Sequence, residues 1–87
     1  MDLEYTIKSE NGIHARPASC LARILQKHPD VIVNVLHSGR EYEVKSMLSI
    51  MKLGLKQNDN VIFRLDGPNQ TEENALKKQL DELLADS

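Results

Sequence analysis

The spacing of the apolar residues switches repeatedly between two periods, and this switching constrains the fold more than any other feature of the chain. In residues 2–8 every second residue is apolar, as expected for a strand with one face in water. From Ala15 the apolar residues recur instead at i, i+3, i+4 and i+7, in the set Ala18, Leu21, Ala22 and Leu25. This second spacing predicts an amphipathic helix that ends before Pro29.

The middle of the chain predicts a hairpin followed by a short helix. Residues 31–36 are rich in β-branched and apolar side chains, and the turn Ser38-Gly39 separates them from a second alternating run that extends to Val44. Residues 46–53 then predict a helix with Ser46 as its N-cap and Gly54 as its C′ residue.

The last third of the chain predicts one more strand and one more helix. Apolar and other side chains alternate over residues 61–65, and Gly67-Pro68 ends this fourth strand. Thr71 is predicted to cap the final helix, on which Glu73 and Lys77 form an i, i+4 pair. The buried stripe of this helix is expected to consist of Leu76, Leu80, Leu83 and Leu84.

The predicted order is therefore β-α-β-β-α-β-α in a chain of 87 residues, enough for a single domain that spans residues 1–87. Four strands with one largely polar face need helices on the other face only. This predicts an α+β open-faced sandwich, in which three helices cover one face of a four-stranded antiparallel sheet.

Charge and composition exclude several classes of function. The net charge of −2 provides no basic field for nucleic acid or an anionic membrane, and no apolar run approaches the roughly 18 residues of a membrane span. The chain begins without the cationic and apolar regions of a secretory signal, so a cytoplasmic protein is expected. It is also expected to be a monomer. Three histidines and one cysteine lack metal-ligand spacing, so no metal or cofactor is expected. His28 and His37 are predicted to be solvated or capping, and Cys20 to be a small packing residue.

The segment from Gly12 to Ser19 places His14 at the N-cap region of the first predicted helix, with Pro17 in its first turn. Unpaired N–H groups and the helix dipole make such an end an anion site, and Arg16 adds a charge-assisted contact for phosphate oxygens. The same positive groups disfavour protonation of His14 and so favour its neutral, nucleophilic form. A hydrolase would need a base or metal to activate water, which this segment lacks. The pattern suggests a carrier, although a single histidine in a turn is more often structural or solvated.

Two motifs resemble the HPr family, the histidine-containing phosphocarriers of the bacterial phosphoenolpyruvate-dependent sugar phosphotransferase system. The string GIHARPAS at residues 12–19 is similar to the family's active-site signature. Residues 45–55 are similar to its regulatory-serine segment, and Gly67 and the final helix also fall where the family has them. The chain departs from the family pattern in one extra residue near residues 28–30, in Ser49, which stands where many relatives have glycine, and in a loop without glycine before the fourth strand.

The resemblance implies roles for particular residues. His14 would be phosphorylated through Nδ1, with Ala15, Arg16 and Pro17 stabilising the phosphoryl group, and Ser46 would be the regulatory, phosphorylated position. The implied partners are enzyme I as donor and the IIA components of sugar-specific enzymes II as acceptors. A serine kinase/phosphorylase and a transcriptional regulator are further implied partners. The protein would be a phosphocarrier rather than an enzyme.

The helix predicted at residues 46–53 is apolar almost all round, whereas a short helix on a sheet buries only one face. At 100° per residue, Ile50 and Leu53 point one way and are assigned to the core. We expect the other three, Met47, Leu48 and Met51, to form an exposed docking patch, the role that the family gives this helix. The alternative is that all five residues belong to the core.

Two other functions remain open from the sequence. A regulatory paralogue would act only by docking through the Ser46 helix, although such paralogues tend to lack the histidine that this chain keeps. A sheet-based RNA binder would stack bases on aromatic side chains, but the chain has only Tyr5, Tyr42 and Phe63 and a slightly negative charge.

Overall fold

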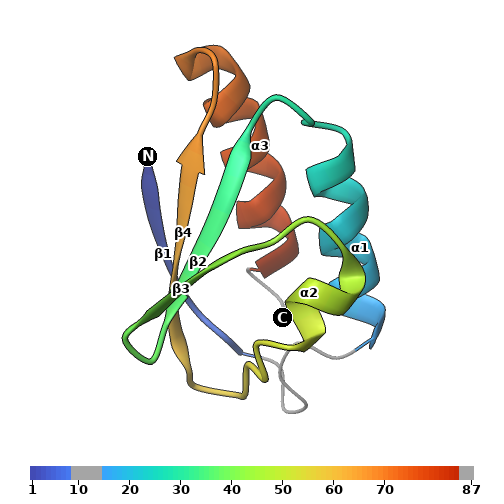
Figure 1. The fold of residues 1–87 in the computed structure, drawn as a ribbon, viewed down its shortest axis with the longest axis vertical. Helices are drawn as coiled ribbons and strands as arrows, with labels where there is room; N and C mark the ends of the chain where they lie inside the picture. The colour runs from blue at the N-terminus through green and yellow to red at the C-terminus, as the bar shows by residue number, and fades with distance from the viewer. Residues whose placement is uncertain (9–14, 85–87) are drawn as a thin grey trace.

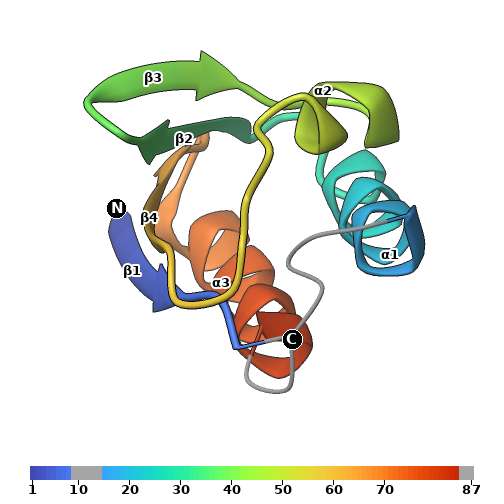
Figure 2. The same cartoon turned by 90° about the horizontal axis from the view of Figure 1, so that it is seen from below.

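A four-stranded antiparallel sheet forms one layer of the molecule. The computed structural model describes residues 1–8 and 15–84, and the strands follow the spatial order β1-β4-β2-β3. Their bounds are β1 Asp2–Thr6, β2 Ile32–His37, β3 Arg40–Glu43 and β4 Asn60–Asp66. All the helices of the described residues lie on one face of this sheet (Figures 1 and 2). The predicted order and open-faced architecture are thus confirmed.

Three helices of the described residues pack on the sheet, and the first and the last do so through their predicted apolar stripes. They are α1 Ala15–Gln26, α2 Met47–Met51 and α3 Gln70–Leu84 (Figure 1). The stripe predicted for α1 is buried, as are Leu76, Leu80 and Leu84 of α3, whereas Leu83 is only half-buried. None of these helices within the described residues is long and apolar enough to cross a membrane.

The core lies between the sheet and the helices. Strand β4 pairs with both β1 and β2, and its alternating residues Val61, Phe63 and Leu65 are buried in this core. Tyr5 on β1 packs its ring edge-on against Phe63, with the ring centroids 5.6 Å apart. The Tyr5 hydroxyl donates a 2.6 Å hydrogen bond to Asp81 on α3, which joins the edge of the sheet to that helix.

The hairpin between β2 and β3 turns through two residues with left-handed backbone. Ser38 and Gly39 have φ angles of 53° and 78°, the combination of a two-residue hairpin turn that matches strand twist. The turn sets the register that places Leu36 opposite Glu41 and Asn34 opposite Glu43. The backbone therefore follows the Ser-Gly turn signal of the sequence.

Strand β1 ends at Thr6, two residues earlier than predicted, because a loop takes over its hydrogen bonding. The Ile7 amide donates to the carbonyl of Asp59 (2.9 Å), and the Asn58 amide donates to the carbonyl of Ile7 (2.7 Å). Asn58 adopts a left-handed φ of 72°, a backbone conformation that asparagine tolerates better than most residues. It supplies this conformation in a loop that lacks glycine.

Helix α3 is capped by Asn69 rather than by the predicted Thr71. The helix begins at Gln70, and the Asn69 side-chain oxygen accepts a 2.9 Å hydrogen bond from the Glu72 amide. The predicted Glu73–Lys77 pair is also wrong. Glu73 turns back to accept from the Gly67 amide (3.1 Å), and Lys77 pairs instead with Asp81 (2.8 Å).

The cap gives a stability prediction with an internal control. Asn69→Ala should lower the free energy of unfolding by about 1 kcal/mol, because it leaves the Glu72 amide without its acceptor. Thr71→Ala should change it by much less, since Thr71 lies inside the helix and exposed. Urea denaturation of the two variants and the parent measures both values, and equal losses would contradict the assignment of Asn69 as the cap.

Candidate functional site

The predicted phosphoryl site lies at the beginning of α1. The helix starts at Ala15, as the sequence predicted, so its first turn contains Ala15, Arg16 and Pro17. His14 itself lies outside the described residues, and the roles predicted for these four side chains remain predictions. The backbone of a first helical turn has N–H groups without intrahelical acceptors, at the positive end of the dipole. The chain next to His14 therefore has the local geometry that favours an anion.

Helix α2 lies beside the half of α1 that contains its N-terminus (Figures 1 and 2). Of the residues on α2, Ile50 is 1% exposed and is part of the core, while Leu53 just beyond it is partly buried against that core. Met47, Leu48 and Met51 are 42%, 63% and 41% exposed. The prediction that these three side chains form an exposed surface is thus confirmed, and we call them the α2 patch.

Ser46 caps α2 through a reciprocal arrangement with Ser49. The Ser46 hydroxyl accepts from the Ser49 amide (3.3 Å), and the Ser49 hydroxyl accepts from the amides of Ser46 (3.0 Å) and Lys45 (3.1 Å). The Ser49 hydroxyl also donates to the Ser46 carbonyl oxygen at 2.8 Å. The predicted cap is confirmed. The contribution of Ser49 was missed, although a side chain with an acceptor three residues after the cap is the sequence pattern of a capping box.

The end of α2 differs slightly from the prediction. Lys52 is the C-cap, and Gly54 follows two residues later with a left-handed φ of 63°. Leu53 therefore takes the C′ position that was predicted for Gly54, and Gly54 lies at C″. The Leu53 amide continues the turn by donating to the carbonyl of Ile50 (3.1 Å).

The two described histidines and the cysteine differ from their predicted environments. His28 Nε2 lies 2.7 Å from Gln79 Oε1, and His37 Nε2 lies 3.1 Å from Asp59 Oδ2. Their side chains are 13% and 16% exposed, so both are structural residues rather than solvated ones. Cys20 is exposed, which corrects its assignment as a packing residue. Among the described residues no group of three or more His, Cys, Asp or Glu side chains is placed to hold a metal ion.

The fold and the α2 patch define a small open-faced α+β domain that presents an apolar surface beside a helix N-terminus. The family model described as "PTS HPr component phosphorylation site" matches residues 2–86 of the sequence. Over 80 residues the chain is 38% identical to the phosphocarrier protein HPr of Mycoplasma pneumoniae, covering 91% of each chain. It is 42% identical over 66 residues to HPr of Mycoplasma genitalium, covering 76% of this chain and 75% of that protein. The chain belongs to the HPr phosphocarrier family.

Solved structures show the same fold at lower sequence identity. A solved structure of a histidine-containing phosphocarrier protein superposes with a TM-score of 0.81 at 23% identity, over 97% of both chains. HPr-C-His from Thermoanaerobacter tengcongensis superposes with a TM-score of 0.78 at 24% identity, over 100% of this chain and 98% of that one.

Proposed function

We propose that this chain is a cytoplasmic phosphoryl carrier, which accepts a phosphoryl group on His14 from enzyme I and passes it to a IIA component. The observation that carries the proposal is the match to the HPr family model across residues 2–86, a range that includes His14. The start of α1 at Ala15 supports it, because the free amides of that turn would stabilise phosphate oxygens. Arg16 would add a charge-assisted contact, and Ala15 and Pro17 would contribute to the geometry of the helix entry.

In the proposed reaction His14 Nδ1 attacks the phosphorus of the phosphoryl group carried by enzyme I, and the bond between phosphorus and the donor atom of enzyme I breaks. The transfer runs again in the same manner when a IIA component accepts the group from His14. The carrier needs no activated water, because water would only hydrolyse the adduct. The α2 patch would dock both partners in turn, and its two methionines suit this because unbranched side chains repack easily against different surfaces.

The proposal is tested by incubating the chain with phosphoenolpyruvate and enzyme I. We expect a phosphoryl adduct that is labile in acid and forms only when both are present. A regulatory paralogue that acts through docking alone would share the α2 patch but would form no such adduct. The measurement therefore separates the two functions for this chain.

We further propose that Ser46 is a regulatory position, the target of a serine kinase/phosphorylase, and that its modified form reaches a transcriptional regulator. Ser46 is exposed and immediately precedes the α2 patch. A phosphate there would add about −1.5 to −2 charge next to Met47 and would oppose an apolar or acidic partner. Its effect on the fold should be small, because the charge lies at the beginning of a helix.

Ser46→Asp tests this regulation, because aspartate is a good N-cap and carries part of the charge. We expect the variant to be as stable as the parent but to accept phosphoryl groups from enzyme I several-fold more slowly, and the difference should shrink when salt is added. Ser46→Asn is the matched control, since it caps equally well without charge and should transfer at the parental rate. Equal transfer rates for the Asp variant and the parent at low salt would show that Ser46 acts only as an N-cap.

A further inference from the structure

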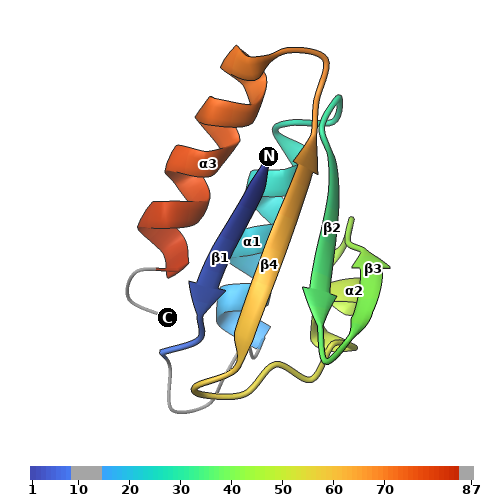
Figure 3. The same cartoon turned by 90° about the vertical axis from the view of Figure 1, so that its left-hand side faces the viewer.

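The face of the sheet that no helix covers carries a groove of about 850 Å³, which lies away from the α2 patch. Figure 3 shows β1, β4 and β2 with nothing of the described chain in front of them. Residues on this face alternate with the core residues along each strand. Since α2 lies on the other side of the sheet, the groove and the α2 patch can be occupied at the same time.

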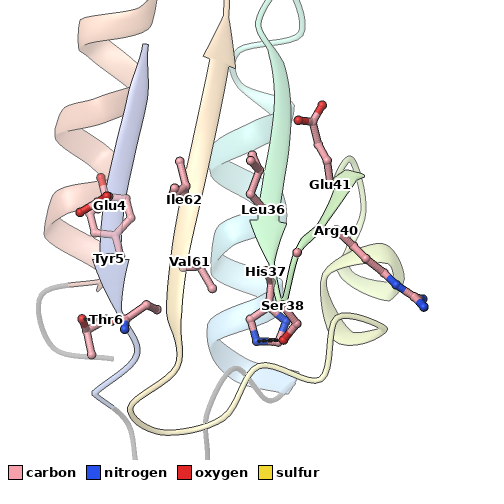
Figure 4. Close-up of a pocket in the computed structure, with 12 residues that line it drawn as sticks. Glu4, Tyr5, Thr6, Leu36, His37, Ser38, Arg40, Glu41, Val61 and Ile62 are labelled. Carbon is pink, nitrogen blue, oxygen red and sulfur yellow. Dashed lines mark hydrogen bonds between the residues drawn. The ribbon is translucent and has the colours of Figure 1, made fainter.

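Strand register places four residues of this face in one row across the sheet. Glu4 lies opposite Ile62, Ile62 lies opposite Leu36, and Leu36 lies opposite Glu41. Figure 4 shows Ile62 and Leu36 between Glu4 on one side and Glu41 on the other. Both apolar side chains are partly exposed to solvent. The row therefore has an apolar centre with a carboxylate at each end.

Asp2, Arg64 and Asn34 lie opposite one another in the neighbouring row, and two of them hold the Glu41 carboxylate in place. Arg64 forms a two-point contact with Asp2, at 3.1 and 3.3 Å, and a 2.8 Å contact with Glu41. The Arg64 guanidinium lowers the pKa of the Asp2 carboxyl, which keeps that group charged. Asn34 donates a further 2.7 Å hydrogen bond to Glu41. Glu41 is thus held in place, whereas the Glu4 carboxylate has no ion-pair or hydrogen-bond partner among the described residues.

The net charge of this face decides whether it attracts a cationic or an anionic partner. The side chains on it include the five carboxylates of Asp2, Glu4, Glu41, Glu43 and Asp66 and the guanidinium of Arg64. Arg40 also lines the groove, and Lys45 lies 3.4 Å from Glu43, so the net charge of the face with these two cations is −2. Nucleic acid, an anionic membrane and the same face of a second copy would all be repelled. A cationic partner is attracted.

We propose that this row docks an extended, basic segment of a partner protein, with a cation, an apolar residue and a second cation at alternate positions. Strands lie about 4.8 Å apart, so Glu4 and Glu41 are separated by three spacings, or about 14 Å. In an extended peptide, side chains on one face repeat about every 6.8 Å, so residues i and i+4 are also about 14 Å apart. The two cations reach Glu4 and Glu41, and the apolar side chain between them contacts Ile62 and Leu36.

The probe for this site is the peptide Lys-Ser-Leu-Ser-Lys, acetylated at its N-terminus and amidated at its C-terminus, titrated into the ¹⁵N-labelled chain. We expect saturable shifts of the amides of residues 4, 36, 41 and 62, while those of α2 stay unchanged. Added salt should weaken binding. Glu4→Gln should weaken it about threefold, the loss of one screened surface ion pair. Ile62→Thr, which keeps a β-branched residue in β4, should also weaken it.

Two controls keep the test specific. Asp66→Asn removes a carboxylate from the same face but outside the row, and it should leave the affinity unchanged. The peptide Glu-Ser-Leu-Ser-Glu should not bind. Equal binding of that peptide, equal affinity after Glu4→Gln, or shifts on α2 would each overturn the proposal. Shifts of the same amides that grow with protein concentration in the absence of peptide would show that a second copy covers the face, and would overturn it as well.

Discussion

Replacing His14 with alanine should abolish phosphorylation by enzyme I and phosphoenolpyruvate. The imidazole nitrogen is the atom to which the phosphoryl group would be bonded, and alanine offers no nucleophile in its place. Neighbouring backbone amides can stabilise a phosphoryl group but cannot accept it. The measurement is the acid-labile label that remains on the purified variant, compared with the parent at equal protein concentration.

The other two histidines provide the controls for this prediction. His28 hydrogen bonds to Gln79 and His37 to Asp59, so each already has a structural partner away from the start of α1. His28→Asn and His37→Asn should therefore keep full labelling, even where they lose some stability. Label that persists in the His14 variant and disappears from either control would move the phosphorylation site to that histidine.

The fold was predictable from the sequence because its elements depend on local periodicity. Alternation at residues 61–65 is sufficient to identify β4, since only one face of an open sheet is buried. The four-residue stripe of α1 and the two turn residues Ser38 and Gly39 are equally local signals. Each of these patterns predicts one kind of element, and in this structure the neighbouring elements leave that element unchanged.

Two of the predictions that failed depend on contacts that no simple local spacing indicates. Glu73 was expected to pair within its helix, but it contacts the Gly67 amide and lies 3.8 Å from the N-terminal ammonium of Met1. His37 was expected to be solvated, but the loop before β4 brings Asp59 to it. Neither partner can be found from local spacing, because the packing of the sheet and its loops decides which side chains meet.

The candidate site was predictable to different extents in its two parts. A short helix that is apolar on all sides must leave some apolar side chains in water, so the α2 patch follows from helical geometry. The reciprocal Ser46–Ser49 cap requires side-chain placement that the sequence indicates only weakly. The row from Glu4 to Glu41 was not predictable, because it depends on the strand order β1-β4-β2-β3 and on the register of three strand pairs.

Helix α2 has an exposed side and a buried side, and substitutions on the two sides should have opposite effects on stability and on binding of enzyme I. Met47 is 42% exposed and is the first residue of the helix, where a negative charge is compatible with the helix dipole. Met47→Glu should therefore leave the free energy of unfolding nearly unchanged. Its affinity for enzyme I should fall by more than about 1 kcal/mol, or roughly fivefold, because a charge would be buried at the centre of an apolar contact.

Ile50→Ala is the matched variant on the opposite side of the same helix. Ile50 is 1% exposed, so its truncation should lower the free energy of unfolding by about 2–5 kcal/mol, through lost burial and a residual cavity. Its affinity for enzyme I, corrected for the folded fraction, should remain near that of the parent, because the α2 patch is intact. Urea denaturation and titration calorimetry with enzyme I measure the two quantities separately. If Met47→Glu destabilised the fold as strongly as Ile50→Ala and kept its affinity per folded molecule, the α2 patch would be a structural surface and docking would have to occur elsewhere.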